Sequence, residues 1–163
     1  MESSFNIEAS SKAERYEQFL ALLRPFISDE TEVVSVLANT TAALHEAFHF
    51  FWVGFYLVKG NQLILGPFQG SAACYRIHKE RGVCGTAWAE ARTQVVADVE
   101  QFPGHIACSS LSKSEIVVPL IAQGEVVGVL DIDSDRLNSF DDTDRYYLEQ
   151  VSQLLVQTLY TSL

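Results

Sequence analysis

The amino-acid sequence predicts an α+β fold, in which a mostly antiparallel sheet carries the N- and C-terminal helices on one face. Two helical stretches come first, two glycine-marked hairpins follow, and a final apolar stretch keeps helical spacing. Helices and strands that fall in separate runs favour this class over alternating βα units. The chain has 163 residues, 48% of them hydrophobic and 20% charged, so we expect one globular domain over residues 1–163.

Two helices are expected before the first strand. In the first, residues 11–26, Ser11 and Glu14 have the spacing of a capping box, and Pro25 ends or bends the helix. Its apolar residues share one face, and so do those of a second helix within residues 29–48. The residues expected to face the core are Tyr16, Phe19, Leu20, Leu23, Val33, Leu37, Leu44 and Phe48.

The middle of the chain is predicted to form a hairpin, a short helix and a single strand. Residues 49–68 hold two aromatic and β-branched runs around a turn at residues 59–61. Residues 82–92, "GVCGTAWAEAR", form a short helix that begins between glycines, and residues 93–99 form a strand. A loop over residues 100–113 separates this strand from the next hairpin.

A second hairpin and a closing helix complete the expected elements. Residues 115–134 are apolar on both faces, so this hairpin should lie centrally in the sheet. The last helix starts near Asp141, and helical spacing is kept by Tyr147, Leu148, Val151, Leu154, Leu155 and Leu159.

Charge and hydropathy exclude several classes of partner. The formal charge of −10 argues against nucleic acid or an anionic membrane surface, because either would repel the chain. The N-terminus lacks the apolar run of a signal peptide, and no segment reaches the roughly 20 apolar residues of a membrane span. We therefore expect a cytoplasmic protein, whose cysteines stay reduced and are buried, metal-binding or redox-active.

Three cysteines, Cys74, Cys84 and Cys108, lie in or beside glycine-marked loops. With His105 they could supply four zinc ligands, but intervals of ten and twenty-four residues do not match the close pairs of structural zinc sites. Cys84 lies in the first turn of a predicted helix, whose dipole favours the thiolate, whereas His105 could share a proton with Cys108. The residues alone leave open which thiol reacts, and inert core cysteines are the alternative.

Three carboxylates flank the second predicted hairpin. Asp131 and Asp133 alternate along one strand, so both point to one face, and Glu115 begins the facing strand. A three-residue turn at residues 122–124, with Gly124 left-handed, would place Glu115 opposite Asp131 on that face. A two-residue turn would instead separate the acids. We favour the three-residue turn, and the alternative is solvated carboxylates at a strand end.

Clustered carboxylates would bind a cation such as an ammonium group. Because like charges cannot all ionise at close range, one proton would also be retained near neutral pH and supply a general acid. Trp52 and Tyr56, at strand positions of the same parity, could line an apolar or methyl-bearing group, although such aromatic residues more often belong to the core.

Seven short motifs together resemble one known family. They are "WVGFYLV", "LILGPFQG", "ACYRI", "RGVCGTA", "FPGHIAC", "SEIVVPL" and "GVLDIDS". In this order they resemble the free methionine-(R)-sulfoxide reductases, single GAF domains that reduce the R epimer of the free amino acid. The resemblance runs from about Leu37 to the end of the chain, and the helix within residues 1–27 lies outside its strong part.

The resemblance implies a role for each candidate residue. Cys108 would be the attacking thiol, Cys74 the resolving thiol that forms a disulfide with it, and Cys84 a third thiol that can join the exchange. The residues that would bind the substrate are Trp52, Tyr56, Glu115, Asp131 and Asp133.

The mechanism expected from these roles needs no metal or organic cofactor. Glu115, kept protonated by its acidic neighbours, would donate to the sulfoxide oxygen while Cys108 attacks sulfur, and thioredoxin would reduce the resulting disulfide. Association into a homodimer is left open. The competing interpretation is a non-catalytic GAF-type sensor of a small ligand, which is disfavoured by the acids at the site and by the end of the chain at Leu163.

Overall fold

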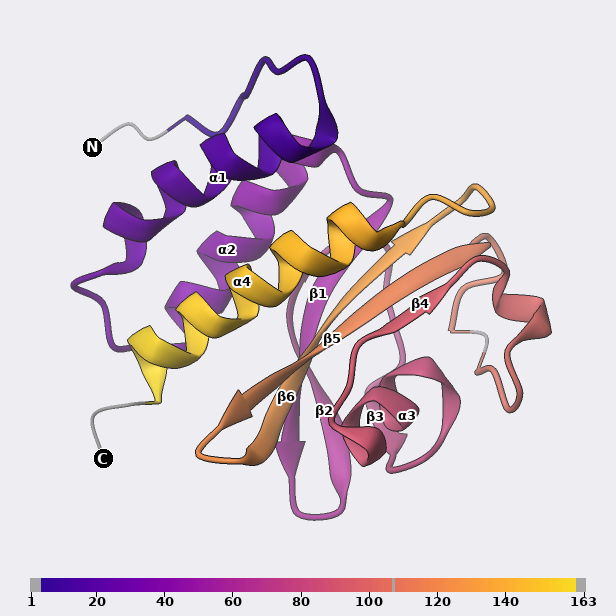
Figure 1. Ribbon diagram of the computed structural model, residues 1–163. Coiled ribbons are helices and arrows are strands. Elements are labelled where there is room, and N and C mark those ends of the chain that lie inside the picture. The colour runs from indigo at the N-terminus through magenta and orange to yellow at the C-terminus, as the bar shows by residue number, and fades with distance from the viewer. Residues whose placement is uncertain (1–3, 107, 161–163) are drawn as a thin grey trace.

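The computed structural model describes residues 4–106 and 108–160 (Figure 1). It confirms the expected helices and both hairpins. The short strand β3 is an addition, because three residues carry no periodic signal. The elements are α1 (Lys12–Ile27), α2 (Val33–Phe48), β1 (Trp52–Lys59), β2 (Gln62–Gln69), β3 (Arg76–His78), α3 (Gly82–Glu90), β4 (Gln94–Val96), the 3₁₀ turn η1 (Val99–Gln101), β5 (Ser114–Ala122), β6 (Glu125–Ser134) and α4 (Asp142–Leu159).

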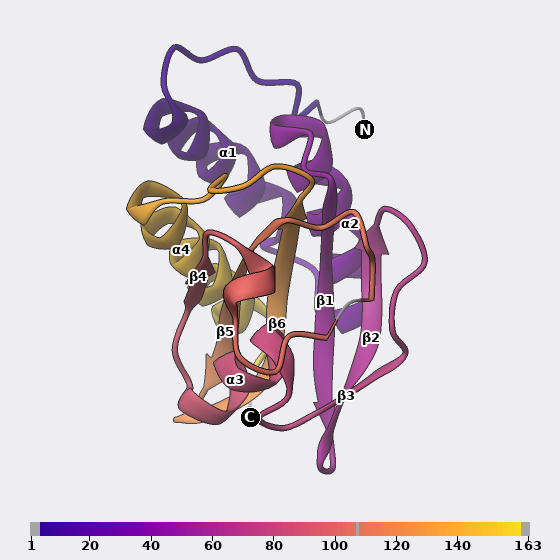
Figure 2. The same ribbon diagram turned by 90° about the vertical axis from the view of Figure 1, so that its right-hand side faces the viewer.

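Within the described residues the strands form one six-stranded sheet in the order β3-β2-β1-β6-β5-β4, and all neighbours are antiparallel. Helices α1, α2 and α4 lie on one side of the sheet, whereas α3 and the segment after β4 lie on the other (Figures 1 and 2). The predicted α+β class, with terminal helices on one face, is confirmed. None of the described helices is long and apolar enough to cross a membrane.

Side chains that alternate along the strands divide the core into two halves. On β1, Val53 and Phe55 pack with the three helices of one face, whereas Trp52 and Tyr56 pack with α3 on the other. Strands β5 and β6 are buried on both faces over most of their length, as their central position requires. The α3 side of the sheet therefore carries the candidate aromatic residues.

Helix α1 begins at the expected cap but differs from the prediction in two details. The Ser11 hydroxyl accepts a bond from the backbone N–H of Glu14 at 3.1 Å, but the Glu14 carboxylate accepts from Ser10, so only half of the capping box forms. Pro25 lies inside the helix, which continues to Ile27. Proline leaves the carbonyl of Ala21 without its helical partner, and Ala21 is exposed, so water can replace that bond.

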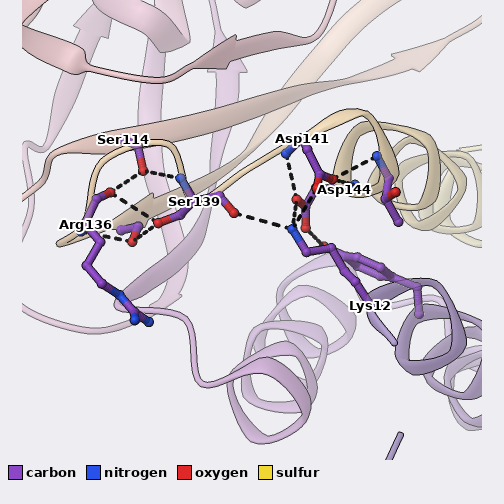
Figure 3. Close-up of polar contacts among 9 residues, drawn as sticks. Lys12, Ser114, Arg136, Ser139, Asp141 and Asp144 are labelled. Carbon is purple, nitrogen blue, oxygen red and sulfur yellow. Dashed lines mark hydrogen bonds and ion pairs between the residues drawn. The ribbon is translucent and has the colours of Figure 1, made fainter. Parts of the chain in front are cut away.

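Polar contacts hold the start of β5 and join α1 to α4 (Figure 3). Lys12 Nζ lies 2.7 Å from Oδ2 of Asp144 in the first turn of α4. In the loop before α4, the Ser114 hydroxyl donates to the backbone carbonyl of Arg136 at 2.6 Å. Ser114 is the first residue of β5 and Glu115 is the second, so this bond fixes the end of the strand that carries Glu115.

The β5–β6 turn is shorter than predicted. Ala122 pairs with Glu125, so Gln123 and Gly124 form a two-residue turn with φ angles of 53° and 82°. Positive φ at both central residues is the signature of a type I′ turn, whose twist suits a hairpin. The predicted three-residue turn is therefore wrong, whereas the left-handed conformation of Gly124 is confirmed.

A β-bulge restores the face that the shorter turn alone would reverse. The register of the two strands shifts between Leu120 and Ile121, where β6 contains one extra residue, Val127. Two turn residues and one bulge residue have the same parity as a three-residue turn. Glu115 and the two aspartates therefore share a face, by a different route from the one predicted.

Replacement of Gly124 by valine should destabilise the protein by about 1–2 kcal/mol or more, because a β-branched residue resists the left-handed region. No atom lies within 4 Å of the position that a Cβ would take, so the backbone conformation alone sets the loss. Urea unfolding measures it. Gly124→Asn is the matched control, because asparagine tolerates this conformation, and equal losses in both variants would contradict the explanation.

Candidate active site

A cavity lies on the α3 side of the sheet, where β1, β5 and β6 face the start of α3 and residues 105–106 and 108–112. Its volume is about 60 Å³. This is room for roughly four to six water molecules, which suits a small amino acid better than a nucleotide. The lining includes most of the candidate residues, namely Trp52, Tyr56, Cys84, Cys108, Glu115, Asp131 and Asp133.

Strand pairing brings the three carboxylates together on this face. Glu115 lies opposite Asp133, and Asp131 lies opposite Val117, two residues further along β5. On the other side of β6, Trp52 lies opposite Asp133. The predicted pairing of Glu115 with Asp131 is wrong by two residues, and a shift of two residues leaves every side chain on its original face.

Burial and mutual repulsion raise the pKa values of these acids. Glu115 and Asp131 are each only 6% exposed. Burial first, and then the charges of Asp131 and Asp133, hold the pKa of Glu115 well above its usual range. Burial also raises the pKa of Asp131, and burial with the Asp131 charge raises that of Asp133. The cluster can therefore keep a proton near neutral pH and present its remaining charge to a cation.

Two buried polar atoms at the cavity, Oδ1 of Asp131 and Nδ1 of His105, have no hydrogen-bond partner among the described residues. An unsatisfied buried group costs about 1–3 kcal/mol. A ligand or ordered water that supplies the missing bond would recover that free energy. The Asp131 oxygen is placed to accept an N–H from such a ligand.

The raised pKa of Glu115 should make folding stability depend on pH. Its usual pKa is 4.5. Above that pH the unfolded chain releases the proton while the folded protein keeps it, so the free energy of unfolding should fall by about 1.4 kcal/mol per pH unit until the folded pKa is reached. Glu115→Gln should remove the contribution of Glu115, and so make the slope less steep by that amount, in urea unfolding at a series of pH values.

Glu125→Gln is the matched control for this measurement, because Glu125 is an exposed acid on the same hairpin. It should leave the slope of stability against pH unchanged. A slope that is the same in Glu115→Gln as in the unsubstituted protein would mean that the retained proton belongs to another group.

Cys74 and Cys108 form a disulfide, with their Cα atoms 5.5 Å apart. Both residues are half-buried. The bond joins the two thiols to which the family resemblance assigns resolution and attack. It is incompatible with a zinc site built from all three cysteines and His105, which the cysteine spacing had already disfavoured.

Cys84 is a free thiol, 4% exposed, in the first turn of α3. Burial first, and then the charges of Asp131 and Glu115, hold the pKa of this thiol well above its usual range. The expectation that the helix dipole favours a thiolate at Cys84 is therefore wrong, because burial of the thiol and the charges of the neighbouring acids outweigh the dipole. One ligand atom from each of these three residues lies within 4.8 Å of the others, so they could hold a metal ion once deprotonated.

Trp52 and Tyr56 form the aromatic wall of the cavity. Their rings are stacked with centroids 6.3 Å apart, and Phe68 stacks on Trp52 at 5.3 Å. Their polar atoms turn toward the segment that leads to the disulfide. Trp52 Nε1–H donates to the carbonyl of Ser71, and the Tyr56 hydroxyl donates to the carbonyl of Cys74, both at 2.9 Å. Nothing in the sequence pattern predicted these two bonds.

Four further polar residues among those described line the cavity and were not predicted, namely Ser71, Arg81, Ser109 and Ser112. Arg81 precedes Gly82, the first residue of α3, whose φ is 63°. A Cβ on Gly82 would lie 3.3 Å from Ile106, so glycine lets α3 begin close to the segment that carries Cys108. The sequence signal for Arg81 is a basic residue directly before the glycine that starts a helix. This signal is weak, because most exposed arginines do not line a cavity.

A GAF domain is the class of protein that this fold defines. The antiparallel sheet has three helices on one face and a ligand-sized cavity on the other. The GAF domain family model matches residues 28–159, so the chain belongs to the GAF family.

Individual relatives define the family more closely. The chain is 58% identical to GAF domain-containing protein A of Dictyostelium discoideum, over 95% of this chain and 99% of that protein. It is 44% identical to the free methionine-R-sulfoxide reductase of Escherichia coli, over 93% of each. The structure of free methionine-R-sulfoxide reductase from Neisseria meningitidis in complex with its substrate matches with a TM-score of 0.94 and 51% identity, over 96% and 95% of the two chains. The chain belongs to the free methionine-R-sulfoxide reductases, a family of oxidoreductases.

Proposed function

We propose that this protein reduces free methionine-(R)-sulfoxide to methionine with a pair of cysteines. The observation that carries the proposal is the Cys74–Cys108 disulfide at the edge of a small cavity in which three carboxylates meet. The names of two relatives, at 44% and 51% identity, state this activity for those proteins and support it for this chain.

The carboxylates bind the substrate's ammonium group in this proposal, and the aromatic wall binds its methyl group. The unpartnered Oδ1 of Asp131, with Asp133 beside it, supports the ammonium contact. The stacked rings of Trp52 and Tyr56 give the methyl group an apolar surface. A methionine sulfoxide residue within a protein has no free ammonium group, so a preference for the free amino acid follows.

The chemistry uses one acid and two thiols. Glu115 donates its proton to the sulfoxide oxygen while the Cys108 thiolate attacks sulfur. The hydroxyl group then moves from the substrate sulfur to the Cys108 sulfur, as the substrate's S–O bond and the transient bond between the two sulfurs break and an S–O bond to Cys108 forms. Methionine leaves, and Cys108 is a sulfenic acid. Cys74 then attacks the Cys108 sulfur, so that an S–S bond forms and the hydroxyl group leaves as water. The sulfoxide is reduced, and the two thiols are oxidised to the disulfide. Cys84 stays a thiol through these steps and is available for later exchange.

Thioredoxin is the proposed reductant of this disulfide, in the cytoplasm. Tyr75, next to Cys74, is 81% exposed and offers a docking contact beside the bond. Arg76, Lys79 and Arg81 follow, with only Glu80 among them, in a chain of net charge −10. This local excess of positive charge supports approach by a reductant with acidic residues around its dithiol.

We also propose that residues 1–163 act as one domain, although the family model begins at residue 28. The contacts of α1 with α4 support this. Tyr16 is fully buried, and its hydroxyl donates to Oδ1 of Asp144 at 2.6 Å. Loss of α1 would therefore remove the side-chain partners Tyr16 and Lys12 from a buried carboxylate of α4.

Turnover of the two epimers of free methionine sulfoxide tests the proposed function. The assay contains thioredoxin, thioredoxin reductase and NADPH, and it measures methionine. We expect methionine from the R epimer only. No methionine from either epimer would overturn the proposal and favour a non-catalytic sensor of a small ligand.

A further inference from the structure

The segment that leads from β2 to Cys74 lies directly on the aromatic wall of the cavity. At its start, a Cβ on Gly70 would stand 2.5 Å from Cδ1 of Trp52, so the backbone passes the indole at a distance that only glycine allows. One residue later the indole N–H donates to the carbonyl of Ser71. At the end of the segment the Tyr56 hydroxyl donates to the carbonyl of Cys74.

Residues 70–74 form neither a helix nor a strand, so no regular element fixes their backbone. The hydrogen bonds from Trp52 and Tyr56 therefore contribute strongly to holding this segment in place. Both anchoring side chains are themselves rigidly held. Trp52 is 5% exposed and Tyr56 is 2% exposed, and both belong to the central strand β1. Burial and the Asp131 charge raise the pKa of Tyr56, so its hydroxyl keeps the proton that it donates.

The position of the Cys74 carbonyl bears on disulfide formation, because two cysteines can be bonded only when their Cα atoms lie within about 4.4–6.8 Å. The two Cα atoms are 5.5 Å apart here, across 34 residues of chain. Without anchors, residues 70–74 would carry Cys74 to many positions at which the Cα–Cα distance lies outside that range. The anchored segment keeps the distance within the range before the disulfide forms.

We propose that Tyr56 and Trp52 are positioning residues that hold Cys74 within reach of Cys108, in addition to lining the substrate cavity. The roles of the two thiols in this inference rest on the proposed function. The step that the anchors assist is the condensation of the Cys108 sulfenic acid with Cys74, in which S–S forms, S–O breaks, and the hydroxyl group and the thiol proton leave as water.

The test separates this role from substrate binding by omitting methionine sulfoxide. In a Cys84→Ser background, so that two thiols remain, hydrogen peroxide oxidises Cys108 to the sulfenic acid and yields water. Closure of the Cys74–Cys108 disulfide is measured from the loss of free thiols and from the amount of sulfenic acid that dimedone traps. The equilibrium with glutathione reports the stability of the disulfide.

Tyr56→Phe removes only the hydroxyl group. It should lower the equilibrium constant for closure by about 3- to 10-fold, the scale of one hydrogen bond, and increase the trapped sulfenic acid. Trp52→Phe removes the other donor and should act in the same direction. It also keeps the test valid if Tyr56→Phe fails to fold. The double variant should show a larger loss than either single one.

Tyr147→Phe is the matched control, because it removes a phenol that donates to Glu17 at 2.7 Å on the helical side of the sheet. The equilibrium constant for disulfide closure in Tyr147→Phe should equal that of the unsubstituted protein. Unchanged closure in both Tyr56→Phe and Trp52→Phe would overturn the inference. If the unsubstituted enzyme makes no methionine while Tyr56→Phe still weakens the disulfide, the proposed function fails and the positioning role stands.

Discussion

Cys108→Ser is expected to abolish methionine formation while the fold stays intact. Cys108 is half-buried and lies outside the helices and strands, so exchange of sulfur for oxygen disturbs little of the core. The serine hydroxyl is not ionised near neutral pH and does not replace a thiolate nucleophile. Mixing the reduced variant with an excess of the R epimer, without reductant, should give no methionine, whereas the unsubstituted enzyme should give about one per chain.

Cys74→Ser is the matched control, because it removes the other half of the same disulfide. It should still release about one methionine per chain, since resolution follows product release, and turnover should then stop. If Cys108→Ser and Cys74→Ser each released one methionine per chain, the attacking thiol would lie elsewhere, and Cys84 would be the remaining candidate.

Glu115→Gln is expected to lower kcat by about 10²-fold or more, the usual scale for loss of a general acid. Glutamine has the same size and can still donate a hydrogen bond from the cavity wall, but it cannot transfer a proton. Burial and the charges of Asp131 and Asp133 hold the pKa of Glu115 well above its usual range, which suits this acid to the role of proton donor proposed here. Steady-state kinetics with the R epimer and thioredoxin measure the loss.

Asp131→Asn provides the comparison, because it changes a neighbouring carboxylate that is proposed to bind ammonium. It should mainly raise KM, since an amide attracts a cation less strongly than a carboxylate does. If the two variants showed the same pattern of kcat and KM, proton donation and ammonium binding would not be divided between the two acids as proposed.

The elements of the fold could be predicted because their signals are local. The helical spacing of apolar residues in α1, α2 and α4, and the glycine at each hairpin turn, lie within short windows of sequence. The bulge at Val127 has no such signal, because it depends on how β5 and β6 pack in the assembled sheet. The exact pairing of Glu115 was therefore beyond sequence reasoning, and its face was predicted correctly because the turn and the bulge together have the parity of the predicted three-residue turn.

The electrostatics of the candidate site depend on contacts between residues far apart in the chain. The position of Cys84 at a helix start indicated a reactive thiolate, but this effect is reversed by burial of the thiol in the folded protein and by acids that belong to β5 and β6. The pairing of Cys74 with Cys108 came from the family resemblance and not from spacing. The bonds from the aromatic wall to the segment before Cys74 needed the folded backbone, because backbone carbonyls carry no sequence signal.

The two-residue turn and the one-residue bulge of the β5–β6 hairpin have a consequence for insertions and deletions. Deletion of Val127 would make the pairing continuous from the turn and would leave Asp133 opposite Glu115, because Val127 is the residue that has no partner on β5. Loss of the bulge with every residue kept would instead bring Ile132 opposite Glu115 and turn both aspartates into the helical half of the core. We therefore expect a relative that lacks one residue at the bulge to keep its aspartates on the face of Glu115, so a single gap at Val127 is the alignment that preserves the site.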